Sequence, residues 1–318
     1  MKILVSTPYE LDSLSGNTVS ANRIASILTE AGHDALVIDS SEQCLDADAL
    51  IALHAKKSAG TVRRFRELYP DRRLLIYLTG TDLYSDIPRG CEICEETMTL
   101  ADSLVVSQSA SLGSIPERFA EKARVVRKSI ALPKGGLEFS KEEKSATPSV
   151  VIASHLREVK NPFLVCEALE LRPDLELDVF LLGREIEDGY GGAAERWMEK
   201  EKRFHWVESC PHEKTLQMMQ QSVATLNTSL LEGGANSVGE SIVLGTPVLA
   251  SRIEGNVGML GEGYAGYFDS ADAQGLADLL EKVVSDASFY DALKSQVLKR
   301  QAEFSRETEL EDWLELLG

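Results

Sequence analysis

Two glutamates flank a tight glycine turn in the C-terminal third of the chain, within the segment SLLEGGANSVGESIVLGTPVLAS. Glu232 precedes the turn and Glu240 follows it, with seven residues between them. The glycines permit positive φ and close approach of a ligand, while a helix expected over 237–244 offers free N–H groups to a phosphate. The Glu240 carboxylate can accept two neighbouring hydroxyls, as a ribose presents them. The turn itself consists of Gly233, Gly234, Ala235 and Asn236.

A basic pair follows the first strand expected in the second half of the chain, in the segment SHLREVKNPF. Arg157 and Lys160 stand three residues apart. A guanidinium and an ammonium are what a diphosphate leaving group needs as charge develops on it. A solvated surface pair is the alternative, but ligands of open α/β folds bind beyond the carboxyl ends of strands, so we favour a functional pair.

A second basic cluster ends an expected strand in the first half, where ALHAKKSAG contains His54, Lys56 and Lys57. A single histidine on an apolar run is usually buried with its hydrogen bonds satisfied. Here two lysines follow the histidine in a chain poor in positive charge. We therefore predict that the cluster grips a phosphate-like anion.

Polar residues also follow two other expected strands of the first half. Thr81 and Asp82, within LTGTDLY, suit contacts to a polar ligand, although Asp82 could instead cap the next helix. Gly16 and Asn17 follow Ser15 just ahead of an expected helix, whose free N–H groups could hold an anion. A simple helix cap is the alternative there, and a single glycine is no dinucleotide fingerprint.

Apolar runs alternate with amphipathic stretches along the chain, which predicts an α/β fold with parallel sheets. The expected strands are 2–6, 35–38, 49–53, 74–78, 103–106, 124–127, 149–154, 177–182, 223–226 and 247–250. A helix over 18–31 should end at Gly32 and pack one face on a sheet. That face comprises Val19, Ile24, Ile27 and Leu28. Near the C-terminus, Thr308 and Glu311 have the spacing of a helix capping box.

A change of composition divides the chain. Residues 134–148, KGGLEFSKEEKSATP, have glycines and charges without an apolar period, which indicates a linker. We therefore predict two Rossmann-like domains, residues 1–135 and 148–303, facing a cleft between them, with ligands at the carboxyl ends of their strands. The C-terminal helix, within 304–318, is expected to pack back on the first domain.

Charge and hydropathy restrict the partners. The formal net charge is −18, from 51 acids against 33 bases, and such a field disfavours phosphate backbones and anionic lipid. We therefore expect no nucleic-acid partner. No apolar run approaches the roughly 20 residues of a membrane span, and the N-terminal run is too short for a secretory signal. On these grounds we expect a cytoplasmic protein without a membrane span.

Neither the cysteines nor the acids predict a metal centre. Cys91 and Cys94 form a CxxC pair, but no second ligand pair accompanies them and glutamates of an expected helix face surround them. We interpret them as packed helix cysteines in preference to a redox or metal half-site. Asp46 and Asp48 have the form of a DxD motif, yet they precede a strand, so we read them as a loop. We expect no metal and no cofactor.

The acids and bases together match a known pattern. Glu232 and Glu240, followed by GTPV, resemble the sugar-nucleotide half of metal-independent GT-B glycosyltransferases of the glycogen-synthase-like group. SHLREVKNP is similar to that group's GRL-x3-KG segment, with Lys160 at the lysine position. His155 occupies the position of the family's arginine and Arg157 lies two residues later, so which base contacts the diphosphate stays open. The resemblance covers essentially the whole chain and implies the GT-B fold.

Four segments, ALHAKKSA, LTGTDLY, EGGAN and EGNVGMLGEGYAGYF, further resemble the selenosugar synthases of selenoneine biosynthesis. Those enzymes join selenophosphate to the sugar of a UDP-sugar and release UDP. The resemblance implies UDP-N-acetylglucosamine or UDP-glucose as donor and selenophosphate, or a similar small anion, as acceptor. The basic cluster of the first half would then hold that acceptor.

The resemblance assigns a role to each candidate residue. Arg157 and Lys160 would stabilise the departing UDP, Glu232 would lie near the donor sugar, and Glu240 would hold the ribose. Further donor contacts are expected from Gly233, Gly234, Asn236, Gly16 and Asn17. Acceptor contacts are expected from His54, Lys56, Lys57, Thr81 and Asp82.

Three other functions compete with this hypothesis. An ordinary GT-B enzyme would transfer the sugar to a hydroxyl acceptor. A UDP-sugar 2-epimerase would need catalytic carboxylates from both domains, and Asp82 is the one candidate in the first. A non-catalytic sugar-nucleotide sensor would not need leaving-group stabilisation by Arg157 and Lys160. The segment 206–212 is a further candidate for the border of the uracil.

Overall fold

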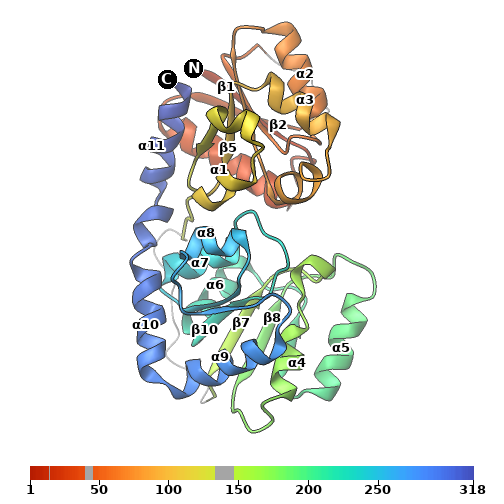
Figure 1. Ribbon diagram of the computed structural model, residues 1–318, viewed down its shortest axis with the longest axis vertical. Coiled ribbons are helices and arrows are strands. Elements are labelled where there is room, and N and C mark those ends of the chain that lie inside the picture. Colours follow the sequence, from red (N-terminus) through yellow and green to blue (C-terminus); the bar gives the residue numbers. More distant parts are fainter. Residues whose placement is uncertain (14, 40–45, 133–146) are drawn as a thin grey trace. The chain divides into compact units, whose positions relative to one another are not determined.

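The computed structural model describes residues 1–13, 15–39, 46–132 and 147–318, and it contains two compact units. The first comprises Met1–Ser129 with Arg306–Gly318, and the second comprises Ile130–Ser305. The expected linker, 134–148, lies outside the described residues except for its last two positions. Figure 1 shows a sheet with flanking helices in each unit.

The first unit is built on a six-stranded parallel sheet of order β2-β1-β3-β4-β5-β6. Its strands are β1 (Lys2–Thr7), β2 (Asp34–Asp39), β3 (Ala49–Leu53), β4 (Arg73–Tyr77), β5 (Ser103–Val106) and β6 (Ala123–Val125). All six strands expected in this half are present. The apolar runs of β1, β3, β4 and β5 are buried because helices cover both faces of the sheet, whereas the edge strands β2 and β6 are only partly buried.

The second unit has a six-stranded sheet of order β12-β11-β10-β7-β8-β9, also parallel. Its strands are β7 (Ser149–Ala153), β8 (Asp178–Leu182), β9 (Phe204–Val207), β10 (Ala224–Asn227), β11 (Val248–Ser251) and β12 (Tyr267–Phe268). The sequence did not predict the edge strands β9 and β12. In β9 only Phe204 is fully buried, and β12 has two residues, so neither produces an apolar run.

Helices connect the strands and cover the sheets (Figure 1). In the first unit they are α1 (Gly16–Glu30), α2 (Ala59–Leu68), α3 (Glu92–Leu100) and α11 (Arg306–Leu317). In the second they are α4 (Leu164–Glu170), α5 (Tyr190–Lys200), α6 (His212–Gln221), α7 (Asn236–Leu244), α8 (Glu254–Leu260), α9 (Ala273–Ser285) and α10 (Ala287–Leu298). Among the described residues, none of the helices is both long and apolar enough to cross a membrane.

Alternate residues of the central strands feed different cores in the first unit. Ile3 packs in one cluster with residues of α1 and α11, whereas Leu4 packs in another with residues of α2 and α3. Because successive side chains of a strand point to opposite faces, the unit has three layers, with the sheet in the middle.

Helix α1 begins at Gly16, where the Ser15 hydroxyl accepts a hydrogen bond from the Thr18 N–H, and it ends before Gly32 at φ +88°. The prediction for its buried face is wrong at one position. Ile24, Ile27 and Leu28 are buried, but Val19 is 46% exposed. Val19 lies in the first turn, on the opposite side of the helix axis from the residues that pack on the sheet.

Helix α11 is held on the first unit by a fully buried carboxylate. Glu309 accepts hydrogen bonds from Arg23 Nε at 3.0 Å, from the Ser129 N–H at 2.7 Å and from the Ser129 hydroxyl at 2.5 Å. The expected capping box at Thr308 is wrong, because the helix already begins at Arg306. The Arg306 guanidinium donates to Glu30 and Ser26 of α1, which extends the helix one turn earlier.

This carboxylate gives a stability prediction. Glu309→Ala leaves the nearly buried Arg23 guanidinium without its charged partner, and such a loss costs about 3–5 kcal/mol. We expect much faster hydrogen exchange at the amides of α1 and β1. Glu67→Ala is the control, since Glu67 pairs with Arg64 on the surface, and should change exchange little. Equal effects of the two substitutions would contradict the anchoring role of Glu309.

Candidate functional site

Each sheet has one pair of neighbouring strands whose connections lead to opposite edges of the sheet. In the second unit this pair is β7 and β10: the chain runs from β7 outward to β8 and β9, then returns to add β10 on the other side of β7. In doubly wound folds the ligand binds beyond the carboxyl ends of strands at this switch point. The loops after β7 and β10 carry Arg157, Lys160 and Glu232.

The structure brings Lys160 and Glu232 together, although 72 residues separate them. The Lys160 ammonium forms an ion pair with Glu232 Oε1, and the two side chains are only 18% and 11% exposed. The same carboxylate oxygen accepts a hydrogen bond of 2.7 Å from the Ser229 hydroxyl. A cation and an anion therefore lie side by side, partly shielded from water, at the switch point.

Backbone hydrogen bonds fix the two loops against each other around this pair. The Leu230 N–H donates to the Val159 carbonyl at 2.8 Å. The Thr228 hydroxyl donates to the Lys160 carbonyl at 2.9 Å. Both bonds join the loop after β10 to η4, a single 3-10 turn at Glu158–Lys160 after β7, so the ion pair stands on a rigid support.

The other basic residues after β7 lie nearer the surface. Arg157 is exposed and has extended backbone ahead of η4. His155 Nδ1 accepts a hydrogen bond of 3.1 Å from the Arg184 N–H. Burial, followed by the charges of Arg157, Arg184 and Lys160, lowers the pKa of His155. His155 is therefore neutral at pH 7, and the cations that act on it are Arg157, Arg184 and Lys160. Arg184, which follows β8, was not identified from the sequence.

The glycine turn does not have the positive φ angles that its glycines would permit. Helix α7 begins at Asn236, and neither Gly233 nor Gly234 is among the described glycines with positive φ. The close approach occurs instead at Gly255, in the first turn of α8. A Cβ at Gly255 would lie 2.1 Å from the Glu232 carbonyl oxygen and 2.8 Å from its Cβ. No pattern in the sequence signals this contact, because it joins segments that only the fold brings together.

Glu240 has a partner that sequence reasoning missed. His212, the first residue of α6, has Nε2 at 2.8 Å from Glu240 Oε1. The hydrogen bond with Glu240, and then its charge, raise the pKa of His212 against the opposing effect of burial. Glu240, which the sequence analysis assigns to a ribose, therefore forms a hydrogen bond with an imidazole in this structure.

In the first unit, the switch point lies between β1 and β3, and His54 follows β3. His54 is 2% exposed and adopts φ +72°. Its Nδ1 lies 3.7 Å from Asp82 Oδ2, and burial lowers its pKa. Asp82 is fully buried and accepts hydrogen bonds from the Ala55 N–H at 2.8 Å and the Thr79 N–H at 2.7 Å. Asp82 therefore ties the loops after β3 and β4 together.

The remaining acceptor candidates lie nearer the surface and have partners within the unit. The Lys56 ammonium lies 2.8 Å from Asp86 Oδ1, and the Lys57 ammonium lies 2.5 Å from the Tyr9 hydroxyl. Thr81 is exposed. The structure thus gathers these residues near one edge of the sheet, but each lysine contacts a different partner. Their role toward an acceptor stays a prediction.

Gly16 and Asn17 open helix α1, which follows β1. Ser15 caps this helix, as the simpler of our two interpretations required. Gly16 is exposed, and a Cβ built on it would meet no atom of the described residues within 4 Å. The role of Gly16 and Asn17 toward a donor stays a prediction.

Comparison with known proteins supplies the family. Residues 137–300, just over half of the chain, match the family model "Glycosyl transferases group 1". The chain belongs to this family. The matched segment contains every candidate residue of the second unit, from Arg157 to Glu240.

Two curated proteins and one solved structure extend the comparison. A Glycosyltransferase 1 domain-containing protein 1 from Xenopus tropicalis is 25% identical over 276 residues, 76% of each chain. A D-inositol 3-phosphate glycosyltransferase from Corynebacterium urealyticum is 24% identical over 257 residues, 72% of this chain and 59% of that protein. The structure of Anabaena Alr3699/HepE in complex with UDP and glucose matches with a TM-score of 0.79, at 17% identity, covering 100% of this chain and 99% of that one. Its likeness establishes the shared GT-B fold.

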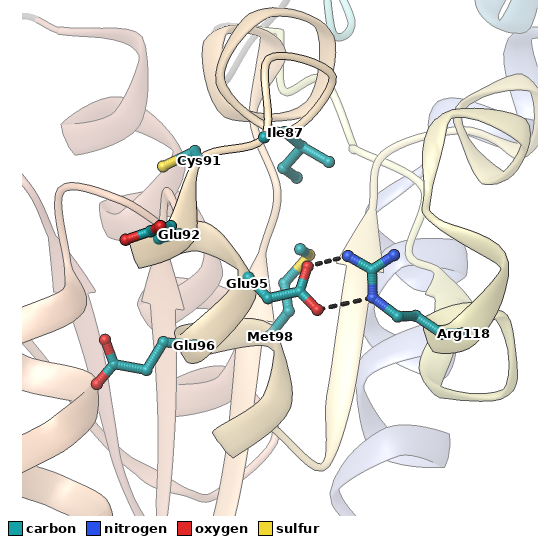
Figure 2. Close-up of a pocket in the computed structure, with 8 residues that line it drawn as sticks. Ile87, Cys91, Glu92, Glu95, Glu96, Met98 and Arg118 are labelled. Atoms are coloured by element: carbon teal, nitrogen blue, oxygen red, sulfur yellow. Dashed lines mark hydrogen bonds and ion pairs between the residues drawn. The ribbon is translucent and has the colours of Figure 1, made fainter.

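Figure 2 shows a pocket beside α3 in the first unit, away from the loops that carry the candidate residues. A Glu95–Arg118 ion pair crosses it. Cys91 also lines it, and its sulfur accepts a hydrogen bond from the N–H of the buried Cys94 at 3.3 Å. The two cysteines thus lie at the start of helix α3, in agreement with our interpretation of them as helix cysteines. In the ion pair, the Arg118 guanidinium donates to the Glu95 carboxylate.

The described part of the chain contains no group of three or more His, Cys, Asp or Glu side chains that could hold a metal ion. Asp46, of the DxD-like motif, pairs with Arg72, and Asp48 accepts from the Lys2 N–H at 2.8 Å. Both acids lie in the segment that precedes β3 and have partners elsewhere in the first unit. The absence of a metal requirement stays a prediction for the activity.

The contact at Gly255 gives a prediction about the site. Gly255→Ala forces the Glu232 loop to move, because the new methyl group would overlap the Glu232 backbone, and overpacking of this kind costs about 1–3 kcal/mol. We expect the Leu230 amide to exchange hydrogen faster as its bond to Val159 weakens. Gly263→Ala is the control, since nothing lies within 4 Å of its Cβ. Unchanged exchange at Leu230 in the Gly255 variant would contradict this account.

Proposed function

We propose that this group 1 glycosyltransferase uses a UDP-sugar and transfers the sugar at the switch point of its second unit. The observation that carries the proposal is the Lys160–Glu232 pair, held between the loops after β7 and β10. The Anabaena protein of the same fold was solved with UDP and glucose, and the Corynebacterium relative is named a glycosyltransferase. These comparisons favour the general reaction, with a hydroxyl acceptor, over any more specialised one.

Each residue of the site has a proposed role toward the donor. Glu240 accepts the ribose hydroxyls, and Glu232 lies beside the hydroxyls of the donor sugar. Lys160 and Arg157 face the diphosphate. Further contacts to the donor come from backbone or amide groups of Gly233, Gly234 and Asn236.

The chemistry follows from where charge develops. The bond from the anomeric carbon to the diphosphate oxygen breaks, and that oxygen keeps the electron pair. The carbon gains a bond to the acceptor oxygen, whose proton is released to solvent. Cations fixed in a partly dry site stabilise that oxygen more than water does, without reorganising during the reaction. Lys160, Arg157 and Arg184 can supply this charge, so we propose that no metal is required.

The Lys160–Glu232 pair also determines what the donor must displace. In the structure the lysine is neutralised by the glutamate. A diphosphate would attract the ammonium, and the sugar hydroxyls would then donate to the released carboxylate. One ion pair is thus exchanged for two interactions with the donor, which leaves no buried charge without a partner.

Lys160→Ala tests this assignment. It should lower the rate of sugar transfer about 100-fold or more, as for removal of one preorganised group that stabilises developing charge. UDP release from UDP-glucose and from UDP-N-acetylglucosamine is measured, together with UDP affinity by calorimetry. Lys202→Ala is the matched control, since Lys202 is an exposed lysine of the same unit that contacts only the Met198 carbonyl in the described structure. An unchanged rate in Lys160→Ala would refute the proposed site.

A selenosugar synthase is the second candidate, because of one observation. Lys56 and Lys57 put two ammonium groups in one loop of a chain with net charge −18, and Asp86 and Tyr9 are partners that a small anion could replace. Selenophosphate carries an anionic selenium near neutral pH, so its attack would need no general base. His54, Thr81 and Asp82 would complete this acceptor site, with His54 and Asp82 as its buried support.

The acceptor is decided by product analysis. Purified protein is incubated with each UDP-sugar, with and without selenophosphate, and mass spectrometry follows UDP and any selenium-containing sugar. If selenophosphate is the acceptor, a selenosugar forms and Lys56→Ala with Lys57→Ala raises the acceptor KM several-fold, while UDP affinity stays unchanged. Arg64→Ala, another exposed cation of this unit, is the control. UDP release without a selenosugar would exclude this candidate and favour hydroxyl acceptors.

A further inference from the structure

His212 reaches Glu240 from a neighbouring helix. Helix α6 follows β9 and packs against α7, which carries Glu240 in its second turn (Figure 1). The His212 ring places Nε2 at 2.8 Å from Glu240 Oε1. This contact joins the first residue of α6 to α7, the helix that begins directly after the glycine turn.

The two partners differ in exposure. The Glu240 side chain is 13% exposed, and the His212 side chain is 65% exposed. The carboxylate is therefore largely covered by protein and can be approached from a limited direction, while the imidazole is mostly in contact with water. A carboxylate has about four lone-pair sites, and His212 uses one of them, so two ribose hydroxyls can still be accepted.

Glu240 is also the only charge near His212 among the elements on which α6 mainly packs. Within α7 it is the single titratable side chain, and β7 has none. The charged neighbours of His212 on α6 itself are Glu213 and Lys214, and Glu208 lies in the loop ahead of the helix. The hydrogen bond and charge that raise the pKa of His212 both come from Glu240.

We propose that His212 is a positioning residue, which holds the Glu240 carboxylate in the orientation that accepts the ribose hydroxyls of the donor. This inference rests on the proposed function, because it takes Glu240 as the ribose contact. A free glutamate side chain has several rotamers, and a ligand must immobilise it on binding. The bond to His212 fixes the side chain beforehand, so donor binding loses less entropy.

The pairing makes donor affinity depend on pH in one direction. Below its raised pKa, His212 is positively charged and its bond to Glu240 is strongest. As pH rises through that pKa, the imidazole becomes neutral and the bond weakens. Affinity for the donor should therefore fall as pH rises from about 6 to about 8, around the ordinary histidine pKa of about 6.5 and above it.

The first experiment compares two ligands in calorimetry at one pH, UDP and 2′,3′-dideoxyuridine diphosphate. His212→Ala should weaken UDP binding about three- to tenfold, the effect of one side chain that must be immobilised. It should leave the dideoxy ligand unaffected, because that ligand has no hydroxyls for Glu240. The KM for the donor should rise with little change in kcat.

The second experiment uses His212→Gln, whose amide can donate to Glu240 but cannot titrate. UDP-glucose is the probe for the pH series, since its diphosphate has no group that titrates near neutrality. The variant should bind UDP-glucose about as well as the wild type does at low pH, with no fall toward about pH 8. His205→Gln is the matched control, because His205 Nε2 lies 3.1 Å from Asp178 Oδ1 elsewhere in the unit, and it should keep the wild-type profile.

The outcomes separate the two claims. If the wild type binds neither UDP nor UDP-glucose, the proposed donor is wrong and the role of His212 falls with it. If the wild type binds UDP and His212→Ala weakens both ligands equally, or His212→Gln keeps the wild-type pH profile, only the role of His212 is refuted.

Discussion

The site of the second unit depends on the ion pair between Lys160 and Glu232. Each charge would be costly to hold at 18% or 11% exposure without a partner, so the two loops that carry them must lie together. The backbone bond from Leu230 to Val159 and the close contact at Gly255 maintain that arrangement. Under the proposed function, a donor that brings its own anion and its own hydroxyls replaces both partners.

The parallel sheet explains why the pair occurs where it does. Every strand of a parallel sheet ends at the same edge, so loops far apart in sequence meet there, and the β7–β10 switch point leaves the space between them uncovered by a connection. The same topology in the first unit brings the loops after β1 and β3 together, and the Lys57–Tyr9 contact joins them. The topology of a parallel sheet therefore positions the candidate residues of both units.

The sequence predicted what depends on local pattern and missed what depends on contacts. Ten apolar runs gave ten strands, but β9 and β12 are too short or too exposed to leave such a run. Spacing identified Glu232, Glu240 and Lys160, because acids and bases after strands are visible in the chain. His212 and Gly255 were missed, since each matters only through a residue that the fold brings to it.

The two units also differ in how their charges are used. In the first unit Asp82 is fully buried and satisfied by backbone donors, and its neighbour His54 is buried beside it, so these residues hold the loops in place. In the second unit Glu232 pairs with Lys160, a partner that a donor would replace under the proposed function, whereas Glu240 keeps its bond to His212 and has lone pairs left for hydroxyls. An exchangeable partner is what a binding residue needs, because its charge is satisfied before and after the ligand arrives. Lys56 and Lys57 of the first unit also have replaceable partners, but any small anion could replace them, so the acceptor must be identified by its product.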